Sequence, residues 1–334
     1  MARCFVTRRL PFPALDRLRA AHEVEVWPSR LPPSYEELTA RAADAEGLLT
    51  LLTDRVDAAL IQGSSGLRAI SNYAVGYDNI DLDAAAARGI PVGNTPDVLT
   101  DATADLTWAL LLAAARKLPE AVAAVRDGDW LTWEPAMYLG ASVFGATLGI
   151  VGMGRIGRAV AQRASGFEME VLGTGGSGGG RSGTGSPGAG DSGGGGSGGG
   201  GSAAAVSLDT LLERSDFVSL HCPLTPETHH LIDDAALARM RPSAILINTA
   251  RGPIVDHDAL RRALFSGEIA GAALDVTDPE PLPPDDPLLS APNLIVAPHI
   301  GSATRVARER MADLAVDNLL VGLDGRPMPH QVGR

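Results

Sequence analysis

The segment from Gly149 to Gly157 constrains the fold of this 334-residue chain more than any other part of the sequence. An apolar stretch leads into the pattern G-x-G-x-x-G, and a helical pattern, RAVAQRAS, follows it. In this setting Gly152 permits a tight turn, Gly154 lets the backbone approach a pyrophosphate, and Gly157 allows a helix to pack closely on a strand. Free N–H groups at the helix start would bind the phosphates. The context predicts a dinucleotide-binding unit, and a purely structural glycine turn is the alternative.

The acidic residue that usually completes such a unit is missing. A carboxylate about 20 residues after the glycines normally binds the ribose 2′-hydroxyl of NAD, at the end of the second strand. That strand is expected at Met169 to Leu172, and no carboxylate follows it until Asp191. The missing acid removes the repulsion that would exclude a 2′-phosphate, and the nearest cation is Arg181. The sequence therefore favours NADP over NAD, although Arg181 could equally be an ordinary solvated charge.

Strands and helices alternate along most of the chain. Short apolar runs predict strands at residues 4–7, 24–27, 48–52, 67–71, 90–92, 148–151, 169–172, 217–220, 244–248, 271–275 and 294–297. Helical patterns lie between them, and one is opened by Ser34, which forms a capping box with Glu37. Such alternation is typical of α/β folds whose parallel sheets are covered on both faces. At about 150 residues per domain, the length predicts two domains.

One glycine- and serine-rich stretch breaks this alternation. Residues 173–202 contain GGGGSGGGGS and almost no apolar side chains. Such a composition cannot bury enough apolar surface to offset its ordering entropy. It predicts a flexible segment over residues 173–205 within the nucleotide-binding unit, and it leaves open whether the stretch is natural or engineered.

Composition argues against several classes of partner. The formal net charge of −12 disfavours nucleic acid and anionic membrane surfaces. The longest apolar run, Trp108 to Ala115, is far shorter than the ~20 residues of a membrane-spanning helix, and the first residues lack the apolar core of a signal peptide. Cys4 and Cys222 fit neither a disulfide framework nor a zinc-binding spacing. We therefore expect a cytoplasmic protein without a metal site.

Three polar residues follow three of the predicted strands. Arg251 follows AILINTA, Glu280 follows AGAALDV, and His299 follows NLIVAP. Ligands of open α/β sheets bind at such strand ends. Each residue alone has a plainer explanation: an ion pair with Asp256 for Arg251, an ordinary loop carboxylate for Glu280, and a helix cap for His299.

Together, these residues supply what the reduction of a 2-keto acid needs from a protein. Arg251 can bind the substrate carboxylate through two parallel hydrogen bonds. His299 can donate a proton to the carbonyl oxygen, because imidazole titrates near neutral pH. Glu280 can hold the imidazole in one tautomer and stabilise its protonated form. Asp275, at the end of its own strand, is placed to contact the nicotinamide side of the cofactor.

Seven segments in order carry a resemblance to a known family. They are VGYDNIDLD, NTPDVLTDATAD, LGIVGMGRIGRAV, SDFVSLHCPLTPET, INTARGPIVD, AALDVTDPEPLPPDDPLL and APHIGSAT. The chain resembles the D-isomer-specific 2-hydroxyacid dehydrogenases over nearly its whole length, except for residues 173–205. The last two segments, with GRPMP near the end, are most similar to glyoxylate/hydroxypyruvate reductases. The resemblance implies reduction of glyoxylate and hydroxypyruvate to glycolate and D-glycerate with NADP or NAD.

The resemblance also implies a role for each matching position. Arg251, Glu280 and His299 fall on the family's catalytic residues. The positions that fall on substrate contacts are Val75 and Gly76, through their backbone amides, together with Ser302 and Trp133. Trp133 resembles a tryptophan that enters the neighbouring subunit's pocket, and an interface or core aromatic is the alternative. The positions that fall on cofactor contacts are Thr103, Gly152, Gly154, Arg155, Ile156, Gly157, Pro223, Thr249, Ala250, Asp275 and Gly301.

The family implies an architecture as well. Two Rossmann-like parallel-sheet domains are expected, with residues 1–99 and 300–334 forming a discontinuous substrate domain and residues 100–299 forming the dinucleotide-binding domain. The active site would lie in the cleft between them. A long apolar helix from Thr100 to Lys117 would connect the domains, and helices up to about Trp130 would form a homodimer interface.

Two other functions stay open at this point. Nucleotide-sensing corepressors share this fold and bind partner peptides, and the three catalytic-type residues do not exclude such a role. A related dehydrogenase of another small acid, such as phosphite, is the second alternative. Formate is disfavoured, because formate enzymes of this family lack the glutamate partner that Glu280 would supply.

Overall fold

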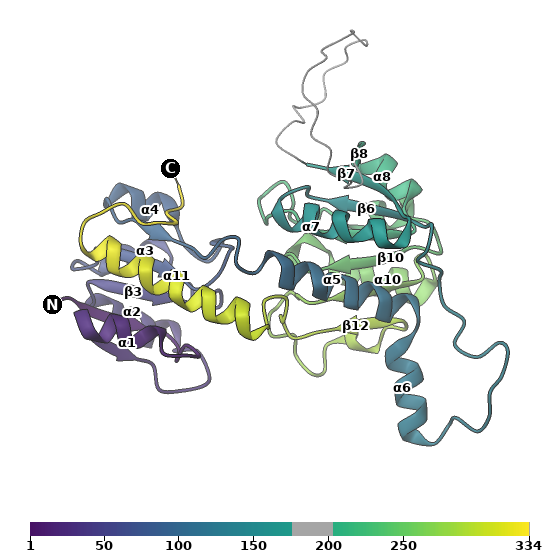
Figure 1. Cartoon of the computed structure of the whole chain (residues 1–334), viewed down its shortest axis with the longest axis horizontal. Helices are drawn as coiled ribbons and strands as arrows, with labels where there is room; N and C mark the ends of the chain where they lie inside the picture. Colours follow the sequence, from purple (N-terminus) through teal and green to yellow (C-terminus); the bar gives the residue numbers. More distant parts are fainter. Residues whose placement is uncertain (176–202, 334) are drawn as a thin grey trace, which may run out of the picture. The chain divides into compact units, whose positions relative to one another are not determined.

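The computed structural model describes residues 1–175 and 203–333, so most of the predicted flexible stretch, residues 176–202, lies outside the described residues. The chain divides into two compact units (Figure 1). Unit 1 comprises Met1–Ala102 and Ser302–Arg334, and unit 2 comprises Thr103–Gly301. Each unit contains a parallel sheet between helices, which confirms the predicted α/β fold class.

Unit 1 contains a five-stranded parallel sheet in the order β2-β1-β3-β4-β5. Its strands are β1 (Arg3–Val6), β2 (Glu23–Val26), β3 (Gly47–Thr50), β4 (Ala69–Asn72) and β5 (Val92–Gly93). The central strands β3 and β4 are buried along their whole length, as expected when helices cover both faces of a parallel sheet. Because the strands are parallel, their carboxyl ends all lie at one edge of the sheet, where loops follow them.

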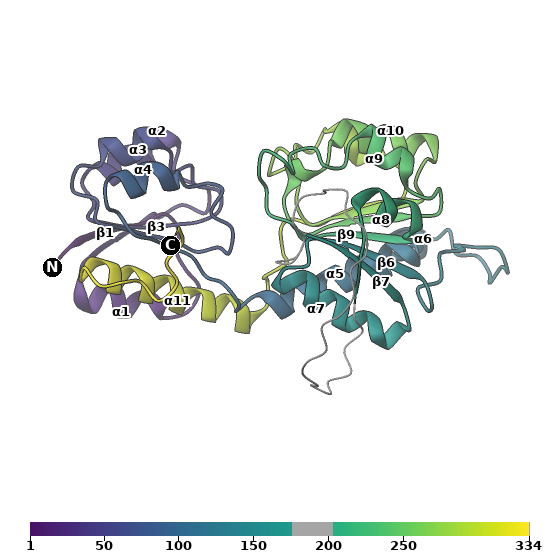
Figure 2. The ribbon, with the colours of Figure 1, turned by 90° about the horizontal axis from the view of Figure 1, so that it is seen from above.

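Helices cover both faces of this sheet. They are α1 (Ala14–Ala21), α2 (Tyr35–Ala43), α3 (Ala58–Gly63), α4 (Leu82–Ala87) and α11 (Arg305–Leu323). Figure 2 shows α1 and α11 on one face and the other three helices on the opposite face. The predicted capping box is confirmed at the start of α2, where the Ser34 hydroxyl accepts from the Glu37 N–H and the Glu37 carboxylate accepts from the Ser34 N–H.

Unit 2 contains a seven-stranded parallel sheet in the order β12-β11-β10-β9-β6-β7-β8. Its strands are β6 (Thr147–Val151), β7 (Glu170–Thr174), β8 (Ala204–Ala205), β9 (Phe217–Leu220), β10 (Ile245–Asn248), β11 (Gly271–Leu274) and β12 (Leu294–Val296). This is the doubly wound order of dinucleotide-binding sheets, in which the winding direction reverses beside the first strand. Here the reversal falls between β6 and β9, which is where a ligand site is expected.

The helices of this part of the chain are α5 (Thr100–Ala115), α6 (Leu118–Asp127), α7 (Arg155–Ala164), α8 (Leu208–Arg214), α9 (Asp234–Arg239) and α10 (His257–Ser266). The last three cover one face of the sheet, and α5 and α7 cover the other (Figure 2). On the α5 face, Trp108 stacks on Phe167 with ring centroids 4.8 Å apart. Among the described residues, no helix combines the length and apolarity needed to cross a membrane.

Two expected boundaries were wrong. Gly173 and Thr174 extend β7, and Ala204–Ala205 form β8, so the flexible segment predicted over residues 173–205 was drawn too wide. β7 extends to Thr174 because it pairs with β6 as far as Val151, which is in register with Thr174. The helix expected to reach Lys117 ends at Ala115, because Lys117 adopts a left-handed φ of 49° before α6 begins.

Candidate active site

The glycine fingerprint forms the turn between β6 and α7, at the point where the sheet reverses. Gly152 has a φ of 100°, a conformation that other residues rarely adopt. A Cβ at this position would lie 2.5 Å from the Cys222 backbone nitrogen, at the end of β9. Glycine is therefore required both by the backbone conformation and by the close approach of the neighbouring strand.

The first turn of α7 is open to a ligand. Gly154 is its N-cap residue and no side chain caps the helix. A Cβ on Gly154 would meet nothing within 4 Å, whereas one on Gly157 would lie 2.2 Å from the Gly152 carbonyl oxygen. The absence of a side chain at Gly157 thus lets the helix pack closely on the turn. The absence of one at Gly154 leaves room for a group to approach the helix N-terminus. Uncapped helix N-termini attract phosphate through their N–H groups and dipole, so these residues fit a dinucleotide pyrophosphate.

The end of β7 is fastened to the same turn. The N–H groups of Gly152 and Met153 both donate to the Thr174 carbonyl, at 3.0 and 3.2 Å. The strand ends at Thr174, and Gly175 follows it, at the place where an NAD-binding carboxylate is usual. Neither residue is acidic, and the next ones in sequence, with Arg181 and Asp191, lie outside the described part of the chain.

Four of the expected cofactor contacts are brought together at the ends of β10 and β11. The Thr107 hydroxyl lies 3.0 Å from that of Thr249 and donates to the Thr103 carbonyl at 2.8 Å. A Cβ on Gly301 would lie 3.4 Å from the Thr103 hydroxyl and 3.2 Å from the Asp275 carboxylate. The first turns of α5 thus sit against the loops that end the sheet. Thr107, which the sequence analysis did not single out, links two of these residues.

Asp275 fixes the backbone that carries His299. Its carboxylate oxygens accept hydrogen bonds from the Ile300 and Gly301 N–H groups, both at 2.7 Å, and its carbonyl accepts from the His299 N–H at 2.8 Å. Burial raises the pKa of Asp275, and the two backbone N–H groups oppose that shift. His299 itself has a left-handed φ of 54°. Asp275 therefore holds a strained turn in place, in addition to any contact with a cofactor.

His299 and Glu280 form a hydrogen-bonded pair. The His299 Nδ1 atom lies 2.5 Å from the Glu280 Oε1 atom, and their side chains are 23% and 29% exposed. The bond joins the loops that follow β11 and β12, as expected for residues at neighbouring strand ends. Because Nδ1 is taken up by Glu280, Nε2 is the ring nitrogen that can exchange a proton with a substrate.

The Arg251 loop packs against the loop that carries Glu280. A Cβ on Gly252 would lie only 2.0 Å from the Thr277 carbonyl oxygen, so glycine is needed for this approach. The buried Asn248 side chain donates to the Arg251 carbonyl at 2.8 Å and accepts from the Ala250 N–H at 3.0 Å. These bonds shape the backbone on which the Arg251 side chain stands. Asn248 was not predicted as a site residue, and only its place at the end of a buried strand could have signalled it.

The remaining predicted residues lie on several elements. Pro223 follows β9, and its carbonyl accepts from the Thr228 hydroxyl at 2.7 Å. Val75 and Gly76 lie on the loop after β4 in unit 1, and Ser302 is a buried residue of unit 1 just before α11. Trp133 lies on the segment after α6 and is 75% exposed. Its exposure removes the core aromatic alternative.

His221 is a second histidine near the fingerprint. Its N–H donates to the Val151 carbonyl at 2.7 Å, and its Nε2 atom lies 2.8 Å from the buried Ser219 hydroxyl. Burial lowers the pKa of His221 to about 4. The ring is therefore neutral near pH 7, and it is unsuited to deliver a proton there.

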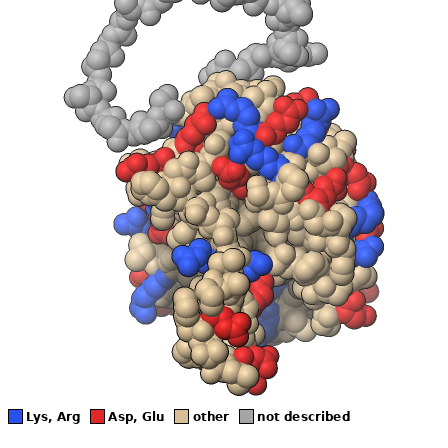
Figure 3. Space-filling view, turned by 90° about the vertical axis from the view of Figure 1, so that its right-hand side faces the viewer, with Lys and Arg blue, Asp and Glu red and all other residues tan. Residues whose placement is uncertain are grey.

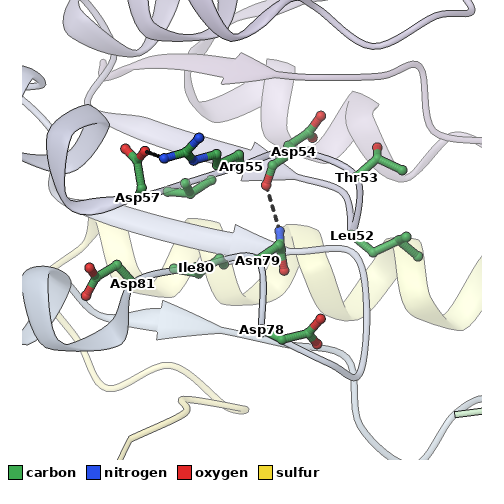
Figure 4. Close-up of a pocket in the computed structure, with 10 residues that line it drawn as sticks. Leu52, Thr53, Asp54, Arg55, Asp57, Asp78, Asn79, Ile80 and Asp81 are labelled. Atoms are coloured by element: carbon green, nitrogen blue, oxygen red, sulfur yellow. Dashed lines mark hydrogen bonds and ion pairs between the residues drawn. The ribbon is translucent and has the colours of Figure 1, made fainter. Parts of the chain in front are cut away.

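A cavity of about 470 Å³ opens on unit 1, lined by residues 52–57 and 78–81 (Figure 4). Four of its side chains are carboxylates: Asp54, Asp57, Asp78 and Asp81. Its one cationic lining residue, Arg55, is paired with Asp57 at 2.9 Å. A cavity with this charge would repel an anionic substrate, so we do not assign it to the reaction.

Comparisons with known proteins identify the family of this chain. The family model described as "D-isomer specific 2-hydroxyacid dehydrogenase, NAD binding domain" matches residues 108–182 and 200–301, all within unit 2. The chain belongs to this family. It is therefore an NAD(P)-dependent oxidoreductase with a dinucleotide-binding domain, as the resemblance implied.

Several relatives match along the whole chain. A glyoxylate reductase of Korarchaeum cryptofilum is 46% identical over 333 residues, covering 99% of this chain and 96% of its own length. A solved structure of a protein from Thermus thermophilus is 49% identical, with a TM-score of 0.87, covering 99% of this chain and all of that one. The NADPH-dependent glyoxylate/hydroxypyruvate reductase of Sinorhizobium meliloti, solved with NADP and malonate, is 33% identical with a TM-score of 0.83, and covers 99% of this chain and 97% of that one.

Proposed function

We propose that this protein reduces small 2-keto acids, glyoxylate and hydroxypyruvate among them, to D-2-hydroxy acids. The observation that carries the proposal is the His299–Glu280 pair, 2.5 Å apart, beside the turn that Asp275 holds. An imidazole oriented by a carboxylate is the arrangement that general acid–base catalysis requires. Two relatives that are 46% identical over 96% and 95% of their own length are glyoxylate reductases, which supports the substrate class.

The proposed roles follow from the chemistry of each side chain. We assign binding of the substrate carboxylate to the Arg251 guanidinium and to the backbone amides of Val75 and Gly76. A guanidinium matches a carboxylate with two parallel hydrogen bonds. Ser302 is assigned a contact beside the substrate. In an acidic protein of net charge −12, Arg251 provides the local positive charge that an anionic substrate needs.

His299 delivers the proton. In the reducing direction the ring starts protonated, and the proton leaves Nε2 for the carbonyl oxygen of the substrate while Nδ1–H stays bonded to Glu280. The ionised Glu280 stabilises the imidazolium before transfer and fixes the tautomer of the neutral ring after it. The dinucleotide, when bound, supplies the hydride that reaches the carbonyl carbon. In the reverse direction the neutral ring takes up the hydroxyl proton.

We propose that NADP is preferred over NAD, and only modestly. The support is the absence of a carboxylate at Thr174 and Gly175, where β7 ends. The pyrophosphate would lie at the start of α7, on Gly154, Arg155 and Ile156. The other assigned cofactor contacts are Thr103, Gly152, Gly157, Pro223, Thr249, Ala250, Asp275 and Gly301.

We also propose that the protein acts as a cytoplasmic homodimer. The support is an apolar surface formed by α6 and the segment after it, whose exposed members are Leu118, Val122, Val125, Trp130, Leu131, Trp133, Tyr138, Leu139 and Phe144. Figure 3 shows uncharged surface over much of this face, interrupted by several charged side chains. Exposed apolar surface on this scale marks an interface with a partner. Sedimentation of the wild type and of Val125→Glu tests the proposed homodimer. A monomeric wild type would contradict it.

A substrate panel tests the proposed reaction. Purified protein is assayed with glyoxylate, hydroxypyruvate, pyruvate and, in the oxidative direction, phosphite, each with both cofactors. We expect glyoxylate and hydroxypyruvate to give the highest kcat/KM, and D-glycerate to be the product of hydroxypyruvate. Turnover of phosphite alone would reassign the substrate. Nucleotide binding without turnover of any acid would instead indicate a sensing or corepressor-like protein.

A further inference from the structure

The loop after β4 has three consecutive carbonyls that all accept hydrogen bonds from within unit 1. The Ala74 carbonyl accepts from the Thr95 N–H at 2.8 Å. The Val75 carbonyl accepts from the Asn94 side-chain amide at 2.8 Å, and the Gly76 carbonyl accepts from the Asn72 side-chain amide at 2.9 Å. Three successive peptide units are therefore fixed from their oxygen side.

Fixing these carbonyls also fixes the opposite side of each peptide. In a trans peptide the N–H points away from the C=O. The N–H of Gly76 is thus directed away from Asn94, and that of Tyr77 away from Asn72. Within the described part of the chain, the N–H groups of Val75, Gly76 and Tyr77 donate to no protein acceptor. Successive N–H groups left free in this way make a site for an anion.

Asn72 is held so firmly that its amide can have only one orientation. It is fully buried, and its Oδ1 atom accepts from the Thr50 hydroxyl at 3.0 Å. Its Nδ2 atom donates to both the Gly76 carbonyl and the Asn79 Oδ1 atom, at 2.9 and 3.0 Å. Asn79 in turn donates to the Asp54 carbonyl at 2.9 Å (Figure 4) and to the Leu51 carbonyl at 3.0 Å. The loop is tied through Asn72 and Asn79 to the end of β3.

Asn94 stands on an equally fixed backbone. Its carbonyl accepts from the side chain of the buried Asn318 at 2.8 Å, and its N–H donates to the His330 carbonyl at 3.1 Å. These bonds use only backbone atoms of Asn94. A substitution of its side chain therefore removes the bond to Val75 while the backbone around it keeps its partners.

We propose that Asn72 and Asn94 are positioning residues that orient the Val75–Gly76 peptides to bind the substrate carboxylate. The proposal rests on the proposed function, which assigns carboxylate binding to this loop. Neither asparagine needs to touch the substrate. Each acts by holding a carbonyl inward, so that the loop is already arranged when the anion arrives and less ordering is required on binding.

The test uses two variants and one matched control. Asn94→Ala removes one of the holding bonds, and Asn72→Asp keeps the acceptor for Thr50 but removes both donated bonds. The control is Ser71→Ala, which deletes a buried hydrogen bond to the Ala315 carbonyl from the adjacent residue of the same strand. Among the described residues, the Ser71 side chain makes no hydrogen bond to the loop. Urea unfolding of all three full-length proteins reports the loss of stability that each change causes.

We expect Asn94→Ala to raise the KM for glyoxylate about tenfold, a change of ~1.4 kcal/mol. The kcat should fall less than threefold and the KM for NADPH should stay constant, because the lost contact acts on the substrate carboxylate. Calorimetric titration with oxalate, a carboxylate that cannot be reduced, should show a matching loss of affinity. Asn72→Asp should act in the same direction, and Ser71→Ala should leave all of these constants within twofold of wild type.

Two results would overturn the positioning role. One is an unchanged glyoxylate KM and oxalate affinity in Asn94→Ala, which decides the matter even if Asn72→Asp fails to fold. The other is an equal loss in Ser71→Ala, which would trace the effect to general destabilisation. The proposed function fails differently, through a wild type that reduces no 2-keto acid. Oxalate titration still tests the loop in that case. A wild-type protein that binds no oxalate would show that the loop forms no anion site.

Discussion

The charge on Glu280 should control how fast this enzyme reduces its substrate. The perturbation is Glu280→Gln, which keeps the size of the side chain and one acceptor oxygen for His299 Nδ1 but removes the negative charge. In the native protein that charge lies 2.5 Å from the imidazole ring. Reduction needs the imidazolium, and the ionised carboxylate favours it.

The magnitude follows from the geometry. A hydrogen bond to a charged group stabilises by ~1.5–3 kcal/mol. The two side chains are 23% and 29% exposed, and solvent screening places their pair near the lower end of that range. At ~1.4 kcal/mol per factor of ten, removing the charge should lower kcat/KM for reduction about tenfold at constant pH.

The assay is kcat/KM for glyoxylate reduction at one fixed pH for wild type, Glu280→Gln and a control, Asp278→Asn. Asp278 is an exposed carboxylate two residues away on the same loop. Its removal changes the net charge equally but leaves the His299–Glu280 bond in place, so kcat/KM should stay within about twofold of wild type. An equal loss of kcat/KM in both variants, or a loss in neither, would refute the pairing, and Glu280 would be an ordinary loop carboxylate.

Three further outcomes are expected. Arg251→Ala should lower kcat/KM for glyoxylate about 100-fold, equivalent to ~3 kcal/mol, while NADPH binding measured by fluorescence persists; a variant within threefold of wild type would exclude Arg251 from the site. NADPH should exceed NADH in kcat/KM at fixed glyoxylate, and a clear NADH preference would show that another group replaces the missing carboxylate. Burial raises the pKa of Cys4 to about 12 and that of Cys222 to about 11, so both thiols stay protonated at pH 8. Mass spectrometry should accordingly find slow alkylation by iodoacetamide in the native protein and fast alkylation after unfolding, whereas rapid native labelling would contradict the burial.

Strand positions could be predicted from the sequence because buried parallel strands are almost continuously apolar. Phe217–Leu220 was predicted to the residue, and β10 and β12 each within one. No helix was predicted at α3 (Ala58–Gly63), whose six residues span fewer than two helical turns. The two-residue strand β8 has no signal of its own, because it forms only by pairing with β7.

The same distinction, between features that are local in the sequence and contacts that form only in the folded chain, applies to the candidate site. Arg251, Glu280 and His299 could be proposed because strand ends in a parallel sheet are local features of the sequence. What brings two of their loops together is Gly252, whose missing side chain lets the Arg251 loop lie on the Thr277 carbonyl. Nothing in the string INTARGPIVD shows that contact, because its partner lies 25 positions further along the chain.

The residues that position others were missed for a related physical reason. Asn72, Asn94 and Asn248 each direct a side-chain amide to a backbone carbonyl, and buried asparagines have no periodicity or spacing that marks this use. The partner of Asn94 is 19 residues away, so the bond exists only after β4 and β5 have paired. A reacting group can be inferred from its chemistry and its place at a strand end, because reactivity belongs to the side chain itself. A positioning group is an ordinary polar side chain. Its function depends on which carbonyl lies within hydrogen-bond distance once the sheet has formed.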